Sequence, residues 1–209
     1  MITVLDLGIS NIGSVVRALQ YLGLPHQVSE TKSEILSAEK IMLPGVGSFK
    51  SGVEAIEKKD LKDVLRFKAI EQKVPFLGIC LGMQLMFSQG VEGGTYGGLD
   101  FIRGEVIPLR VDRTQFPVPH MGWNEVASSD LKLFEGIPDK SCFYFVHGFE
   151  ADARDEHAKI AFTEYGGIKI AAAVEKNNIW GVQFHAERSQ KLGLDILKNF
   201  QRFSCFEQE

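Results

Sequence analysis

Cys80 lies between two glycines, Gly78 and Gly82, where one sequence pattern gives way to another. The apolar run 74–79 is typical of a buried strand, and residues 81–86 have helical spacing. Glycines two positions before and after a nucleophile are typical of a nucleophile elbow, a sharp strand-to-helix turn, here with sulfur in place of oxygen. Such a turn holds the thiol at a helix N-terminus, where the dipole favours the reactive thiolate. An inert buried cysteine is the alternative, and the paired glycines favour catalysis.

A thiol nucleophile needs a base, and the base needs a group that orients it. Among the five histidines, His185 directly follows the apolar strand 179–184 and precedes Glu187 by two residues. If the backbone stays extended, both side chains point to the same side, and the carboxylate can fix the imidazole tautomer. This spacing alone also fits a structural or metal-binding histidine. Combined with Cys80, it predicts a Cys–His–Glu catalytic triad.

Acyl transfer also requires hydrogen-bond donors for the developing oxyanion. The segment Pro44–Gly47 directly follows a short apolar strand, Ile41–Leu43, and its glycines allow a backbone amide to turn toward a substrate. The Leu81 amide, at the start of the elbow helix, is a candidate second donor. We therefore expect an oxyanion hole at Val46, Gly47 and Leu81, with an ordinary strand-end turn as the alternative.

The rest of the chain must bring these groups together. In its first half, short apolar strands alternate with amphipathic helical segments, which predicts a mostly parallel sheet with helices on both faces. The expected strands are 2–7, 26–29, 41–43 and 74–79, and the expected helical segments are 14–22, 51–58 and 60–72. Loops at the carboxyl ends of such strands meet at one edge of the sheet. We expect residues 8–11, the Pro44–Gly47 segment, Cys80 and the loop after Phe184 to meet there.

After residue 90 the pattern changes to strand-like runs separated by turns and prolines, which indicates an additional antiparallel section. These runs, after a glycine-rich loop, are 101–110, 123–126 and 143–146. Two further strands are expected near 168–174 and 179–184, followed by a last helix at 189–203. Neither a repeat nor a linker divides the sequence. We therefore expect an α/β fold in a single domain, residues 1–209.

Composition excludes several classes of protein. The chain has 209 residues and a net charge of −4 without a basic tract, which argues against a nucleic-acid partner. Three cysteines at irregular spacing indicate a reducing compartment and offer no metal-site motif. The N-terminus lacks a basic region typical of signal peptides, and no apolar run has the length of a membrane span. We expect a cytoplasmic protein with no membrane partner.

Three motifs, GICLGMQ (78–84), GVQFHAE (181–187) and PGVGSF (44–49), resemble those of class I glutamine amidotransferases. Two more, PHMGWN (119–124) and YFVHG (144–148), resemble the glutaminase subunit of imidazole glycerol phosphate synthase, and the resemblance extends to about residue 201. It implies a flavodoxin-like fold, no cofactor or metal, and hydrolysis of L-glutamine through a γ-glutamyl thioester. Cys80 would be the nucleophile, His185 the general base and acid, and Glu187 its orienting group.

The resemblance also implies binding roles. Gly45, Gln84 and Glu92 would contact glutamine; a helix-surface glutamine and a solvated loop acid are the alternatives for Gln84 and Glu92. Asn11, Trp123, Tyr144 and Arg188 would lie at the interface with a (β/α)₈-barrel synthase subunit. In that heterodimer, ammonia passes through the barrel and converts N′-[(5′-phosphoribulosyl)formimino]-5-aminoimidazole-4-carboxamide ribonucleotide (PRFAR) to imidazole glycerol phosphate and aminoimidazole carboxamide ribotide, in histidine biosynthesis.

Four departures from the family pattern leave other functions open. Residues 7–10 differ from the usual Tyr-Gly-x-Gly, residues 148–149 are Gly-Phe where a hydroxyl residue and tyrosine are common, Ala186 replaces a proline, and Arg188 replaces a lysine. One alternative is a paralogous glutaminase that feeds ammonia to an enzyme aminating surface sugars. A catalytically silent partner-binding module is disfavoured by the intact triad. A cysteine peptidase is disfavoured by Gln84 and the PHMGWN motif.

Overall fold

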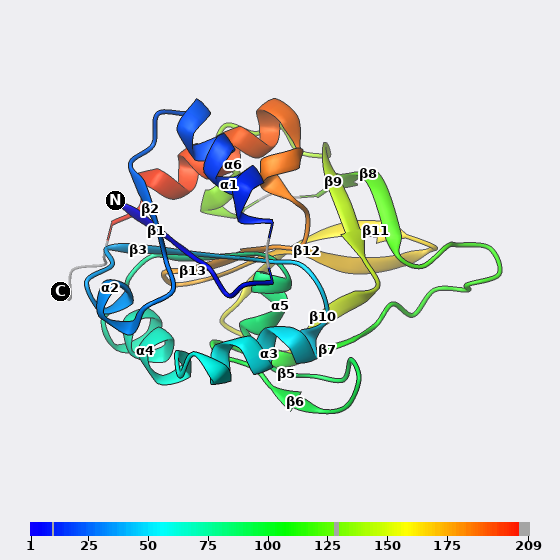
Figure 1. Ribbon diagram of the computed structural model, residues 1–209. Helices are drawn as coiled ribbons and strands as arrows, with labels where there is room; N and C mark the ends of the chain where they lie inside the picture. The colour runs from blue at the N-terminus through cyan, green and yellow to red at the C-terminus, as the bar shows by residue number, and fades with distance from the viewer. Residues whose placement is uncertain (10, 128–129, 205–209) are drawn as a thin grey trace.

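A computed structural model describes residues 1–9, 11–127 and 130–204, and a seven-stranded sheet forms the centre of this part of the chain (Figure 1). Its strands, in spatial order, are β11 (Lys159–Tyr165), β12 (Ile168–Lys176), β13 (Ile179–Val182), β4 (Phe76–Cys80), β3 (Lys40–Gly45), β1 (Ile2–Leu5) and β2 (His26–Ser29). The five strands from β13 to β2 are parallel to one another, whereas β12 is antiparallel to β13 and β11 is antiparallel to β12. The predicted mostly parallel sheet is confirmed.

Helices cover both faces of this sheet, as predicted. On one face lie α1 (Ile12–Tyr21) and α6 (Gln190–Arg202); on the other lie α2 (Lys32–Leu36), α3 (Phe49–Lys58), α4 (Lys62–Arg66) and α5 (Leu81–Leu85) (Figure 1). The amphipathic segment 60–72 is not one regular helix, because a π-helical turn, Phe67–Glu71, follows α4. Within the described chain, no helix combines the length and apolarity that crossing a bilayer requires.

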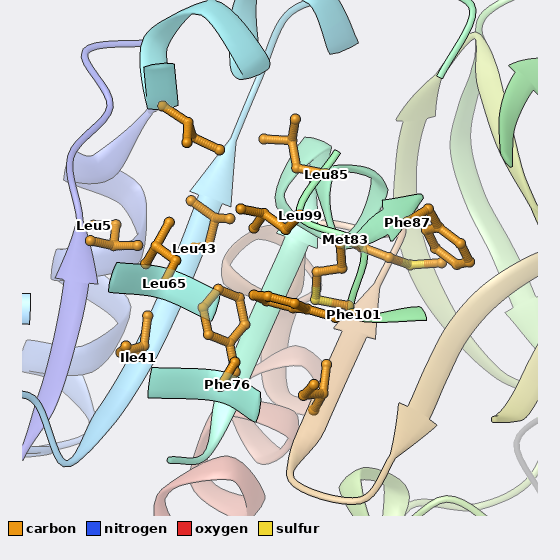
Figure 2. Close-up of a cluster of buried hydrophobic side chains, with 14 of the residues drawn as sticks. Leu5, Ile41, Leu43, Leu65, Phe76, Met83, Leu85, Phe87, Leu99 and Phe101 are labelled. Carbon is orange, nitrogen blue, oxygen red and sulfur yellow. The ribbon is translucent and has the colours of Figure 1, made fainter. Parts of the chain in front are cut away.

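Successive side chains of the inner strands pack alternately into two apolar layers, one on each face of the sheet. Phe76 of β4 points into the layer beneath α3, α4 and α5, where its ring meets Phe101 edge-on at 5.1 Å, as Figure 2 shows. The next residue, Leu77, belongs to the opposite layer under α1 and α6, together with Trp180 of β13. Burying one such side chain stabilises the fold by about 1.5–3 kcal/mol. Packing on both faces therefore stabilises the sheet. The loops that follow the carboxyl ends of its parallel strands thus start from fixed positions.

The second half of the chain adds two smaller sheets at one end of the main sheet. One has the order β10 (Phe149–Ala153), β7 (Ile102–Pro108), β5 (Phe87–Gly90), β6 (Tyr96–Gly97); the other pairs β8 (His120–Val126) with β9 (Ser141–His147). All of these pairs are antiparallel except β5 with β7. The expected antiparallel section is confirmed, although α2, β5, β6, β10 and β11 were not predicted.

Candidate active site

The strand-to-helix turn at Cys80 has the geometry of an elbow. Cys80 ends β4 with φ +54° and ψ −110°, and α5 begins at the next residue. A non-glycine residue at such a backbone angle costs about 1–3 kcal/mol and is typical of functional sites. A Cβ on Gly82 would lie 1.7 Å from the Leu43 carbonyl oxygen, and one on Gly78 would lie 2.6 Å from the Gly82 backbone. Neither position can therefore hold a side chain without moving the backbone.

The structure brings His185 and Glu187 to the same edge of the sheet as Cys80. β13 is parallel to β4 and adjacent to it, so that the segment after β13 emerges beside the elbow. The His185 Nδ1 and Glu187 Oε1 atoms are 2.8 Å apart, and both side chains are buried. The predicted reason for this pairing is wrong: the backbone does not stay extended, because residues 186–188 form a 3₁₀ turn. That turn, rather than strand alternation, brings the carboxylate back to the ring.

Two interactions control the charge of His185. Burial disfavours the protonated ring, but hydrogen bonds and charge attraction to Cys80 and Glu187 outweigh it and raise the pKa of His185 to about 10. Because Nδ1 bonds to Glu187, Nε2 is the ring atom that is left to exchange a proton with the sulfur. A protonated His185 ring can therefore lie beside the sulfur at neutral pH, and a neighbouring cation is what activates a cysteine nucleophile.

Cys80 and His185 open onto a pocket of about 240 Å³. Ten further residues line it: Val46, Gly47, Leu81, Gln84, Glu92, Pro119, Val146, His147, Gly148 and Phe149. Gly45 ends β3 directly opposite Cys80, and a Cβ there would lie 3.0 Å from the Leu81 Cβ. The residues predicted for the nucleophile, the oxyanion donors and glutamine binding are thus gathered around one cavity.

Gln84 and Glu92 are both held by hydrogen bonds at this pocket. Gln84 is buried on α5, and its Nε2 donates to Gln183 Oε1 at 2.9 Å and to the Phe149 carbonyl at 3.2 Å, so that the helix-surface alternative is wrong. Glu92 Oε2 accepts a hydrogen bond from the Phe49 amide at 2.7 Å, at the start of α3. A carboxylate is favourable there because the amides at a helix start lack internal partners.

One of the predicted oxyanion donors is hydrogen-bonded to another loop in this structure. The Val46 amide donates to the Ile9 carbonyl oxygen, at 3.4 Å, in the loop after β1. Gly47 follows with φ +108°, a backbone angle that favours glycine. Leu81 is the first residue of α5, next to Cys80. The Leu81 side of the predicted oxyanion hole is thus built into the elbow, whereas the Val46 amide is bonded outside the pocket.

The residues predicted for a partner interface lie on the surface around this edge. Trp123 of β8 faces Tyr144 of β9 across the ladder, with ring centroids 6.1 Å apart, and Trp123 is 48% exposed. Asn11 immediately precedes α1, which packs against the 3₁₀ turn that carries Arg188; both residues are exposed. Tyr144 is joined to the site by its backbone, because its carbonyl oxygen accepts a hydrogen bond from the His185 amide.

Three buried polar residues beside the pocket were missed. Gln183, two residues before His185, is fully buried between apolar neighbours. His120 of β8 and His147 of β9 lie opposite each other and are hydrogen-bonded. The sequence offered one signal, a glutamine inside the apolar run 179–184. Of the family departures, Gly148 and Phe149 line the pocket and Ala186 is buried in the 3₁₀ turn. Ser10, within the 7–10 departure, and Cys205 lie outside the described residues.

Comparison with known proteins agrees with this geometry. The chain is 41% identical over 203 residues to a protein of Campylobacter jejuni named imidazole glycerol phosphate synthase subunit HisH 1, covering 97% of this chain and 100% of the relative. It is 43% identical to the HisH subunit of Moorella thermoacetica, covering 95% and 93%. A crystal structure of a glutamine amidotransferase has the same fold, with a TM-score of 0.75 at 16% identity over 95% of this chain and 98% of that one. Residues 3–202 match the family model "Glutamine amidotransferase class-I". The chain therefore belongs to the class I glutamine amidotransferases.

Proposed function

We propose that this protein is the glutaminase subunit of an imidazole glycerol phosphate synthase, hydrolysing L-glutamine to glutamate and ammonia. The observation that carries the proposal is the His185 ring, bonded to Glu187 and interacting with Cys80 at the mouth of a pocket. The names of the relatives at 41% and 43% identity support the choice of pathway within the family.

The reaction follows from the positions of the proposed triad. The Cys80 thiolate attacks the carboxamide carbon of glutamine, an S–C bond forms, and the oxygen becomes an oxyanion. As the C–N bond breaks, His185 Nε2 gives its proton to the departing nitrogen, and ammonia leaves a γ-glutamyl thioester. Water then loses a proton to the same nitrogen and attacks the thioester, which releases glutamate and restores the thiolate. Glu187 stabilises the imidazolium in both half-reactions.

The oxyanion needs donors from Leu81 and from the Val46–Gly47 segment. Because the Val46 amide donates to the Ile9 carbonyl, that segment has to change conformation before it can contribute. The loss of one oxyanion-hole donor slows reactions of this type by about 10²–10³-fold. We therefore infer that the free subunit is slow and that its partner turns the segment toward the substrate.

Pocket residues supply the contacts to glutamine. Gln84 lines the pocket and Gly45 pairs with Cys80 in the sheet, so both would contact the carboxamide end of glutamine, and Glu92 would bind the α-ammonium group. Its Oε2 is bonded to the Phe49 amide, which leaves Oε1 for the substrate. Binding of both ends of glutamine would fix the carboxamide over Cys80.

The partner in this proposal is a (β/α)₈-barrel synthase subunit that forms a heterodimer with the chain in the cytoplasm. Exposed Trp123 and the neighbouring Met121, which is 62% exposed, supply an apolar centre for the contact, and Arg188 supplies a charge at its rim. Trp and Arg are enriched at such interfaces. Ammonia would pass from the pocket into the barrel and serve PRFAR conversion in histidine biosynthesis.

A direct test is glutamine consumption by the purified chain, alone, with the barrel subunit, and with the barrel plus PRFAR. We expect little glutamine turnover by the chain alone. With the barrel subunit and PRFAR present, turnover should rise about 10²–10³-fold, because an oxyanion donor is gained. The barrel subunit alone serves as the control. Rapid hydrolysis by the free chain would contradict the inferred activation. Capture of a sugar-aminating enzyme in place of the barrel would favour the paralogous glutaminase and refute the pathway.

A further inference from the structure

A chain of buried amides connects one backbone carbonyl to the nucleophile. The Phe149 carbonyl oxygen accepts from Gln84 Nε2 at 3.2 Å, and the same nitrogen donates to Gln183 Oε1 at 2.9 Å. Gln183 Nε2 in turn lies 3.7 Å from the Cys80 sulfur, within the range for a hydrogen bond to sulfur. Gln183 is fully buried and Gln84 is 5% exposed, so that water does not compete for these bonds.

The direction of every bond in this chain is fixed at its far end. A backbone carbonyl can only accept, so the group of Gln84 that touches Phe149 must be its NH₂. Its second hydrogen points to Gln183, which must therefore present its oxygen to Gln84. The NH₂ of Gln183 then faces Cys80. Reversing Gln183 would place two donors against each other at Gln84 and an oxygen against the sulfur, which is unfavourable at both ends.

We propose that Gln183 is a further catalytic residue, whose side-chain amide donates a hydrogen bond to the Cys80 sulfur and stabilises the thiolate. The inference rests on the proposed function, in which that thiolate is the nucleophile. A hydrogen bond to the charged form of a group favours that form. Gln183 thereby complements His185: one residue takes the proton from the sulfur, and the other stabilises the negative charge that remains.

A second branch of the network fixes the Phe149 carbonyl itself. His147 Nδ1 lies 2.8 Å from this oxygen and must donate to it, which leaves His147 Nε2 as an acceptor for His120 Nδ1 at 3.0 Å. His120 Nε2 then accepts from Asn124 Nδ2 at 3.3 Å. Burial lowers the pKa of both histidines to about 4, in agreement with two neutral rings. These hydrogen bonds hold the Phe149 carbonyl in place at the far end of the amide chain.

Asn178, at the other end of β13, shows what a purely structural buried amide looks like. Its Nδ2 donates to two backbone carbonyls, those of Ala69 and Val74, each at 2.8 Å. Gln183 instead bonds to one side chain and to the reacting sulfur. A buried amide that packs among apolar residues is costly unless it is hydrogen-bonded. Asn178 thus joins the π-helical turn Phe67–Glu71 to the segment before β4. Gln183, in contrast, bonds directly to the sulfur of the proposed nucleophile.

The test compares Gln183→Leu with Asn178→Leu in the full chain. Cys80 alkylation by iodoacetamide is followed as a function of pH by peptide mapping, because its rate follows the thiolate fraction and needs no glutamine. We expect Gln183→Leu to slow alkylation about tenfold at the acid pH values where the thiol form predominates, the factor expected for one hydrogen bond to a charged group. In the complex with the barrel subunit, kcat should fall while KM for glutamine stays unchanged. Asn178→Leu should lower the melting temperature without slowing alkylation.

Wild-type alkylation kinetics in folded Gln183→Leu, or equal slowing in Asn178→Leu, would overturn the proposal. A second measurement needs no Gln183 variant: the Gln183 amide proton signal in the NMR spectrum should move when Cys80 is replaced by alanine, and an unmoved signal would also refute the hydrogen bond. Failure of the proposed function would look different, since the wild-type complex would then not consume glutamine whatever the alkylation rates.

Discussion

The two walls of the pocket differ in how completely they are arranged for reaction. On the β4–β13 wall, Cys80, His185 and Glu187 are buried, mutually bonded and held by a tightly packed elbow. On the wall formed by the end of β3, the Val46 amide is bonded to the Ile9 carbonyl, and Val46 is 39% exposed. In the proposed mechanism, the nucleophile is therefore in position while one oxyanion donor is not. The reaction would require the Val46–Gly47 segment to change conformation first.

Replacing the proposed nucleophile on the β4–β13 wall should have the largest effect on glutamine turnover. Cys80→Ala should abolish glutamine-dependent synthesis by the complex, because no thioester can form. Synthesis from added ammonium salts should persist, because the barrel subunit does not use Cys80. Both rates are measured by product formation from PRFAR. Appreciable glutamine-dependent activity in this variant would show that another group attacks the substrate.

A substitution in the wall formed by the end of β3 should lower glutamine turnover and leave the Cys80 thiol reactive. Gly47→Ala places a side chain at φ +108°, 3.3 Å from Ser51 Oγ, and restricts the rotation that the segment needs. We expect glutamine turnover in the complex to fall by about 10²-fold, the cost of one oxyanion donor. The rate of Cys80 alkylation by iodoacetamide is the matched control and should stay at the wild-type value. Parallel loss of both would mean that the two walls are not independent.

A milder change on the β4–β13 wall weakens the interaction between His185 and Glu187 and keeps Cys80 and His185 in place. Glu187→Gln keeps an oxygen acceptor for His185 Nδ1 but removes the negative charge, so the pKa of His185 should fall from about 10. In wild type the ring should stay protonated through neutral pH, and in the variant it should lose its proton at lower pH, as followed by NMR. Turnover should decrease about 10- to 100-fold, less than the full contribution of acid–base catalysis. An unchanged titration would contradict the assigned charge interaction.

Sequence patterns sufficed for β1, β3, β4 and β13, because these strands are short apolar runs buried on both faces. They also located the elbow, since Gly78 and Gly82 are dictated by backbone contact distances of the local turn. Strands of mixed polarity such as β11 were missed, because half of their residues face solvent and their order comes from the neighbouring strand. Secondary structure of this kind is decided by tertiary contacts that spacing does not encode.

The site shows the same division between local and long-range information. The His185–Glu187 pair was located from its spacing, although a 3₁₀ turn and not an extended strand makes the contact. Gln183 and the His120–His147 pair were missed because their partners are 27 to 103 residues away along the chain. The bond from Val46 to Ile9 joins two loops and was equally invisible. What a residue bonds to across the fold can be found only from the structure.

Affinity labelling can identify the group that attacks glutamine, which we propose to be Cys80. The glutamine analogue 6-diazo-5-oxo-L-norleucine should bind in the pocket and alkylate one cysteine, which mass spectrometry of the digested protein identifies. We predict the label on Cys80, with Cys142 and Cys205 unmodified and with protection by excess glutamine. Labelling of Cys142 or Cys205 with Cys80 left intact would show that Cys80 is not the nucleophile.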